Sequence, residues 1–198
     1  MAIIVDKEKK KRDIALSCKE LILKNGINNL TVSQVAKSAK IGKGTIYEYF
    51  KNKDEIVFEL VNILMQQYNE AKEKKLLDAA STKEKIKVLM DFFYDDAYFD
   101  IRVLYKDFTA ITLMNNNENM VTFQTERFKF YTDWIDDIIQ EGIDKQELIP
   151  HAKELVMGLF AYSQGIFIMS VTSNAIESLK DEMNTHIDTL FTLMEVKS

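Results

Sequence analysis

The sequence predicts an all-α protein of about nine helices. Apolar residues recur at intervals of three and four along most of the chain, which is the period of a helix with one buried face. The 198 residues include one Pro and six Gly, so few positions interrupt a helix. A hydrophobic content of 46%, with 11% aromatic residues, is sufficient for a buried core in a chain of this length.

The first helix is expected between Lys7 and Gly26. Ile14, Leu21 and Ile22 fall on one face of this segment, and the glycine ends it. The single cysteine, Cys18, lies among these apolar residues. We interpret it as a small packing residue and not as a reactive thiol.

The stretch from Thr31 to Lys53 has the pattern of two short helices joined by a tight turn. Thr31 and Gln34 have the spacing of a capping box, in which each side chain binds the backbone amide of the other residue. Small apolar residues follow at helical spacing, two glycines interrupt them, and Ile46 and Phe50 resume the pattern. This arrangement predicts a helix-turn-helix.

Charge separates along the chain and favours DNA binding by the N-terminal part. Residues 1–53 carry 12 Lys and Arg against 5 Asp and Glu, whereas residues 54–198 carry 14 against 26. A basic end gains affinity for DNA through counterion release, and an acidic remainder is repelled from the duplex. The second helix of the motif also carries groups that contact phosphates or base edges: Lys43, Thr45, Tyr47 and Tyr49.

A connected pattern runs through this stretch, formed by Thr31, Val35, Ala36, Ala39, Ile41, Gly44, Thr45, Ile46, Tyr47, Phe50 and the run Asn52-Lys53-Asp54-Glu55. It resembles the DNA-binding domain of the TetR family of bacterial one-component repressors. The sequence departs from the family at Lys40, where the turn usually has glycine. A lysine in a left-handed conformation costs about 1 kcal/mol, so the turn is expected to be retained.

The resemblance implies a dimeric DNA-binding transcription regulator, released from a palindromic operator by a small-molecule effector. Residues 1–52 would form a three-helix DNA-binding domain, and residues 53–198 a larger helical domain for effector binding and dimerisation. Contacts with phosphates would come from Thr31, Lys43, Thr45, Tyr47 and Lys53. Base edges would be read by Ser33, Lys43, Gly44 and Tyr49. Thr31 can also be only a helix cap, and Tyr47 only an aromatic residue at the edge of the core.

The later helices are placed by their capping residues and loops. Asn52 with Glu55 predicts a helix from about Lys53, and Ser81 with Glu84 predicts the next. An Asn-rich loop at residues 115–119 separates a helix that ends near Met114 from one at residues 120–141 that stops at Gly142. The last two helices are expected at residues 152–172 and 175–195, the second with the capping spacing of Asn174 and Glu177.

The last two helices carry apolar stripes that can either complete the core or bind a second subunit. A helix-turn-helix contributes few base contacts, so specific operators need two of them on adjacent half-sites. In the TetR family the last two helices pair with those of a second subunit as a four-helix bundle, and the resemblance implies that role here. The expected homodimer interface residues are Leu159, Tyr162, Ile166, Leu179, Met183, Ile187 and Leu190.

The body of the chain contains more aromatic residues than a small core requires, and these suggest a ligand cavity. The same residues also suit a core or an interface. Nearby aspartates would suit a cationic, lipophilic ligand through charge and cation–π contacts. The candidate effector contacts are Phe92, Asp96, Phe99, Tyr105, Phe108, Phe128, Tyr131 and Trp134.

Several classes of function are disfavoured. Two histidines and one cysteine do not assemble a catalytic triad, a zinc site or a Cys–His nucleophile, so we expect no enzyme activity, no metal and no cofactor. No run of about 18 apolar residues was recognised, and the start of the chain does not resemble a secretory signal, so we expect a cytoplasmic protein with no membrane partner. The alternative to a ligand-controlled repressor is an architectural DNA-binding protein of low sequence specificity, without an effector.

Overall fold

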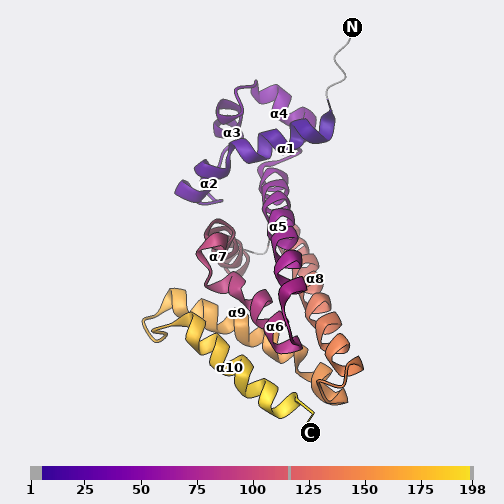
Figure 1. Cartoon of the computed structure of the whole chain (residues 1–198). Coiled ribbons are helices and arrows are strands. Elements are labelled where there is room, and N and C mark those ends of the chain that lie inside the picture. The colour runs from indigo at the N-terminus through magenta and orange to yellow at the C-terminus, as the bar shows by residue number, and fades with distance from the viewer. Residues whose placement is uncertain (1–5, 116, 197–198) are drawn as a thin grey trace. The chain divides into compact units, whose positions relative to one another are not determined.

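The computed structural model describes residues 6–115 and 117–196, and within these ranges the regular structure is helical (Figure 1). Ten α-helices lie within these ranges. The prediction of about nine differs because Cys18 divides the first helix into two. The α-helices are α1 (Lys7–Ser17), α2 (Lys19–Asn25), α3 (Val32–Ser38), α4 (Lys43–Tyr49), α5 (Lys53–Asp78), α6 (Thr82–Met90), α7 (Phe99–Met114), α8 (Glu118–Asp144), α9 (Val156–Thr172) and α10 (Leu179–Met194). Short 3₁₀ helices are η1 (Asp91–Phe93), η2 (Asp96–Tyr98) and η3 (Pro150–Leu155).

The chain packs as two compact units. Unit 1 contains residues 1–69 and 99–124, and unit 2 contains residues 70–98 and 125–198. Helices α5 and α8 therefore contribute residues to both units. Unit 1 contains α7 and the first parts of α5 and α8 beside the four N-terminal helices. These units describe packing, and the functional division into residues 1–52 and 53–198 stays a prediction.

In unit 1, the four short helices surround a small core (Figure 1). Ile14, Ile22, Val35 and Ile46 are at most 1% exposed, and Cys18 is buried beside them with its thiol pKa raised to about 12 by that burial. The expectation that Cys18 is a packing residue agrees with this position.

Helix α7 is attached to α2 by two polar contacts. The Asp107 carboxylate accepts a hydrogen bond of 2.9 Å from the amide of Ile27, and Lys19 forms an ion pair of 2.5 Å with Asp100. Gly26 ends α2 with φ of 79°, a left-handed conformation that favours glycine. The predicted stop at this residue is confirmed.

Unit 2 contains a buried ionic cluster between α5 and η1. Lys72 is 0% exposed and contacts the Asp91 carboxylate and the carbonyl of Val88. Lys75 lies 3.1 Å from Asp91, and the Lys72 ammonium is 4.7 Å from the centre of the Tyr98 ring. Burial lowers the pKa of Lys72 to about 6, so its ammonium depends on the negative charges around it.

The end of α8 packs closely against the start of α6. A Cβ atom on Gly142 would lie 2.5 Å from the Thr82 hydroxyl, so only glycine allows this approach. The prediction that Gly142 ends the helix is wrong, since α8 continues to Asp144 and the left-handed residue is Gln146, with φ of 60°. The loop that follows pairs with the end of the chain through a single antiparallel bridge between Leu148 and Glu195.

The start of the last helix also differs from the prediction. Helix α10 begins at Leu179 and is capped by Ser178, whose hydroxyl accepts from the Asp181 amide at 3.3 Å. The predicted cap at Asn174 is wrong because Ser173 forms a local turn in its place, accepting from the Ala175 amide at 3.3 Å. By contrast, the predicted Ser81 cap is confirmed.

One helical segment among the described residues is long and apolar enough to cross a membrane. Residues Pro150–Thr172 have a mean hydropathy of 1.6, and 33% of the apolar stretch is buried inside the protein. The expectation that no stretch meets this criterion is therefore corrected. A single such helix is weak evidence for a membrane, because a core helix of a soluble protein meets the same criterion.

Candidate nucleic-acid interface

The helix-turn-helix is present and its turn has a defined hydrogen-bond pattern. The Thr31 hydroxyl accepts from the Gln34 amide at 3.3 Å and the Gln34 side chain accepts from the Thr31 amide at 2.8 Å, which confirms the capping box. Lys40 has φ of 55°, with its amide bound to the carbonyl of Lys37 and the Ile41 amide bound to that of Ala36. These two bonds form a Schellman motif, so the lysine adopts the conformation usually given to glycine.

Helix α4 presents a polar face opposite its anchoring residues. Ile46 is 0% exposed and fixes the inward direction. At about 100° per residue, Gly44 and Glu48 lie about 160° from Ile46, one on each side, while Thr45 and Tyr47 lie about 100° away on opposite flanks. Tyr47 is 53% exposed. The helix therefore directs Gly44 and Glu48 straight outward, between the side chains of Thr45 and Tyr47.

The predicted DNA contacts differ in how accessible they are. Ser33, Lys43 and Gly44 are exposed, and Thr31 is exposed while it caps α3. Tyr49 is half-buried and turns toward the core side of α4, so it is poorly placed for base reading. The Lys53 ammonium donates a hydrogen bond of 3.1 Å to the carbonyl of Asn28, which ties the start of α5 to the loop before α3.

Sequence reasoning missed three exposed lysines around the motif, Lys37, Lys40 and Lys51. Within the described part of the chain they form no ion pair, whereas Lys11 pairs with Glu59 at 3.9 Å. Unpaired ammonium groups beside an outward-facing helix are the groups that bind phosphates most readily. Their sequence signal was their position at the end of α3, in the turn and directly after α4.

The eight candidate effector contacts are divided between the two units, and the expectation that they line a cavity stays a prediction. Phe99, Tyr105 and Phe108 belong to unit 1, and the other five belong to unit 2. Phe108 is 3% exposed and packs against the rings of Phe58 and Phe123, as a core residue does. Phe99 is 58% exposed and Asp96 is also exposed. Four of the remaining side chains make aromatic contacts: Phe92 with Phe93, Phe128 with Phe160, and Tyr131 and Trp134 with Phe130. Tyr105 is half-buried.

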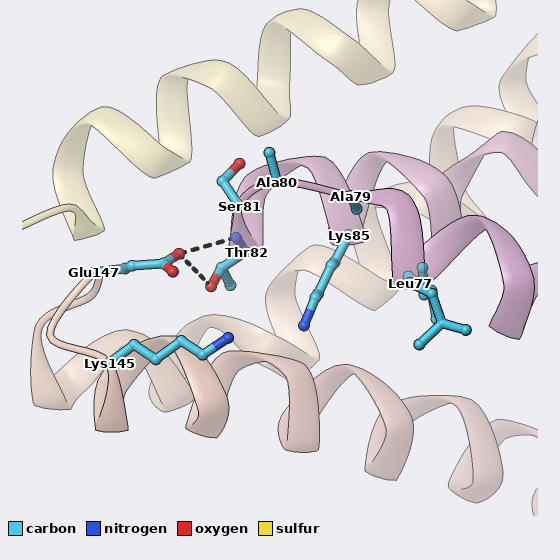
Figure 2. Close-up of a pocket in the computed structure, with 9 residues that line it drawn as sticks. Leu77, Ala79, Ala80, Ser81, Thr82, Lys85, Lys145 and Glu147 are labelled. Carbon is cyan, nitrogen blue, oxygen red and sulfur yellow. Dashed lines mark hydrogen bonds between the residues drawn. The ribbon is translucent and has the colours of Figure 1, made fainter.

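A cavity of about 220 Å³ lies in unit 2 where α5, α6 and the loop after α8 meet (Figure 2). None of the eight candidates lines it. Glu147 accepts hydrogen bonds from the Thr82 amide at 3.0 Å and the Thr82 hydroxyl at 2.7 Å, as the dashed lines in Figure 2 show. These bonds lower the pKa of the Glu147 carboxyl. The carboxylate thus satisfies the first turn of α6 and fastens the loop to it.

The Glu147 contacts predict a pH-dependent contribution to stability. A carboxyl with a lowered pKa in the folded state stabilises the protein above its unfolded pKa of about 4.5, and this contribution is lost as the pH falls below that value. We expect Glu147→Gln to lower the melting temperature by a few degrees at pH 7, at about 2–4 °C per kcal/mol. The difference from the wild type should shrink in scans below pH 4.5; a constant difference would contradict the assigned cause.

The predicted dimer contacts divide into buried and accessible residues. Leu159, Ile166, Met183 and Ile187 are 1–6% exposed within the protomer, so a second subunit cannot reach them, and their assignment to the interface is corrected. They hold α9 and α10 against their own subunit. Tyr162, Leu179 and Leu190 are half-buried. Tyr162 also stacks on His186 with ring centres 3.6 Å apart.

The outward face of α9 is formed by small residues. Gly158, Ala161 and Gly165 are exposed and lie opposite the buried side of the helix. A Cβ atom added at either glycine would meet nothing within 4 Å. On the flanks lie larger apolar side chains, including Met157 at 64% and Met169 at 50% exposure. This is a flat apolar strip that another helix can approach closely.

Metal-ligating groups do not cluster in the ranges that the structure covers. No cluster of three or more His, Cys, Asp or Glu side chains there is arranged to hold a metal ion.

The features that are present are a capped helix-turn-helix, an exposed face on α4 and unpaired lysines around it. Together they define a helical DNA-binding protein.

Comparison with known proteins identifies the family of the DNA-binding domain. Residues 18–60 match the model of the bacterial regulatory proteins of the tetR family. The fatty acid metabolism regulator protein of Bacillus subtilis is 28% identical over 156 residues, which are 76% of this chain and 79% of that protein. Residues 18–60 therefore form a DNA-binding domain of the tetR family type, and the relatives that the chain matches are transcription regulators and not enzymes.

Solved structures agree with this assignment at the level of the fold. A TetR-family regulator from Cytophaga hutchinsonii has a TM-score of 0.80 at 16% identity, covering 99% of this chain and 100% of its own. A transcriptional regulator from Saccharomonospora viridis, solved in complex with choline, has a TM-score of 0.76 at 18% identity, covering 96% and 99%. The helical order predicted from the sequence is therefore that of a known fold.

Proposed function

We propose that this chain is a cytoplasmic homodimeric repressor that binds a palindromic operator and leaves it when a small-molecule effector binds the larger helical domain, residues 53–198. The observation that carries the proposal is the exposed face of α4, anchored by Ile46 and surrounded by unpaired lysines. Residues 1–52 would act as the DNA-binding module. Such a module reads few bases alone, so two copies on adjacent half-sites are required for specificity.

The strip of Gly158, Ala161 and Gly165 supports the homodimer. Its small residues would let the α9 helices of two subunits approach closely, and Tyr162, Met169 and Leu190 would surround the contact. Exposed apolar area of this kind on a soluble protein marks an interaction site. The partner would be a second copy of the same chain, as in the four-helix bundle of the family.

Two relatives suggest which effectors to test first. The Bacillus subtilis relative is a regulator of fatty acid metabolism, and the Saccharomonospora viridis regulator was solved with choline. A fatty acid and choline are thus suitable probes, one an anionic amphiphile and the other an organic cation. An effector must bind the DNA-free form more tightly to cause release, so it should also raise the melting temperature of the free protein.

The outward face of α4 predicts distinct results for two substitutions. Tyr47→Ala removes a contact at the flank and should weaken binding to all sequences alike, whereas Lys43→Ala removes a group able to read guanine and should relax the preference at one position by about 1–3 kcal/mol. Binding to the preferred operator and to single-base variants of it measures both effects. The opposite pattern would mean that the two roles are exchanged.

Competition binding at physiological salt tests the proposal against an architectural, effector-independent protein. Selected genomic fragments would compete with random duplex for the wild-type chain. A specific repressor should prefer its operator by about 10³-fold or more. A ratio near one would support the architectural alternative and contradict the proposal.

A further inference from the structure

An acidic side chain, Glu48, occupies the outward face of the DNA-reading helix α4. It is exposed and points away from Ile46 on the same side as Gly44, one helical turn earlier. The other exposed charged residues between positions 31 and 51 are all lysines: Lys37, Lys40, Lys43 and Lys51. A carboxylate at this place opposes the attraction of the lysines for DNA, so a non-specific binder would gain from its loss.

Glu48 has no structural task in the ranges that the structure describes. It forms no hydrogen bond and no ion pair there, in contrast to Glu55, which binds the amide of Lys51 at 2.8 Å. Gly44, one turn earlier on the outward face, adds no side chain there, and nothing lies within 4 Å of a Cβ atom added to it. The exposure of Glu48 and the open space at Gly44 leave the outward face of α4 accessible to a base edge.

The chemistry of a carboxylate limits what it can bind in the major groove. It accepts hydrogen bonds only and is repelled by phosphates, so its partners are the exocyclic amino groups of the bases. The usual partner of a glutamate in this groove is the N4 amino group of cytosine. Thr45 and Tyr47 lie on opposite flanks of α4 and are placed to contact the phosphates on the two sides of the major groove. Glu48 lies between them and faces the bases.

We propose that Glu48 is a specificity-determining residue that accepts a hydrogen bond from the N4 amino group of a cytosine in each operator half-site. This inference rests on the proposed function and deepens it. The lysines supply affinity for any duplex, and Glu48 restricts that affinity to sequences that place an amino group opposite it.

Selection from a randomised duplex library tests this assignment. Wild-type protein should enrich a cytosine at one position of each half-site. Glu48→Gln should change that position to adenine, because glutamine pairs with the N6 and N7 atoms of adenine, while the other positions stay the same. The preference for cytosine over adenine should change on the order of tenfold to a hundredfold. Glu48→Ala should remove the preference at that position.

Glu20→Gln is the matched control, since Glu20 is exposed on α2 and the substitution changes charge equally. It should leave the selected sequence unchanged. If Glu48→Gln retains the wild-type consensus and only binds every duplex more tightly, Glu48 is a repulsive charge and the inference is overturned. If the wild-type chain enriches no sequence, the proposed function fails and this inference fails with it.

Discussion

Substituting Gly165 with arginine is expected to convert the dimer into a monomer and to abolish tight operator binding. Gly165 lies at the centre of the outward strip on α9, where an added Cβ atom meets nothing within 4 Å in the protomer. Arginine also favours helix by close to 1 kcal/mol relative to glycine, so the subunit should fold. A partner helix, however, would meet a charged side chain in place of a flat surface.

The loss of operator affinity should be on the order of 10²- to 10⁴-fold, because the two linked DNA-binding domains of a dimer bind DNA with the avidity of a bivalent ligand. Light scattering after size exclusion should give a mass near the 23.0 kDa of one chain, in contrast to twice that mass for the wild type. Asn62→Arg adds the same charge at an exposed site on α5 and should remain dimeric. A dimeric Gly165→Arg protein would exclude this strip from the interface.

Replacing Asp91 with asparagine is expected to cause the largest loss of stability. Asp91 is 9% exposed and contacts both Lys72 and Lys75. Removing one partner of a buried ion pair costs about 3–5 kcal/mol, because the other partner stays buried without it. At about 2–4 °C per kcal/mol, the melting temperature should fall by roughly 6–20 °C.

Two further variants separate the buried pair from a general charge effect. Asp96→Asn changes the same charge at an exposed residue of the neighbouring η2 and should leave the melting temperature nearly unchanged. Adding Lys72→Met to Asp91→Asn removes the buried amino group that has lost its partner, and most of the lost stability should return. Equal melting temperatures for Asp91→Asn and Asp96→Asn would show that the cluster is not stabilising.

The helix-turn-helix was predictable from the sequence because short-range contacts define it. The capping box of Thr31 and Gln34 needs residues three apart, and the turn at Lys40 closes through bonds to Lys37 and Ala36. The same holds for Gly26 and for the Ser81 cap. Each of these features depends on a few neighbouring residues, so their spacing specifies the structure.

The orientation of the apolar helices was not predictable in the same way. Helix α9 is apolar on most of its surface, so its sequence does not say which side faces the protomer. Packing turns Leu159 and Ile166 inward and leaves Gly158 and Gly165 outside. In α4, packing likewise places Tyr49 toward the core and Glu48 outward. These assignments depend on contacts between residues distant in sequence.

The effector contacts were the least predictable part of the molecule. Aromatic residues line cores and cavities alike, and composition does not separate the two uses. Phe108 packs against Phe58 and Phe123 in unit 1, while Tyr131 and Trp134 contact Phe130 in unit 2. The role of Gly142 could not be predicted from its neighbours either, because the close approach that requires glycine there is to Thr82, 60 positions away in the sequence.

The central claim is that α3 and α4 form a helix-turn-helix, and that the two copies of it in a dimer read DNA symmetrically. Footprinting of the wild-type chain on its most strongly selected genomic fragment tests this claim most directly. The account predicts two protected half-sites of inverted sequence, with centres separated by about one helical turn of DNA or a multiple of it, and no protection with Gly165→Arg at the same concentration. Uniform protection along the fragment, or a single protected site that Gly165→Arg binds equally well, would contradict it.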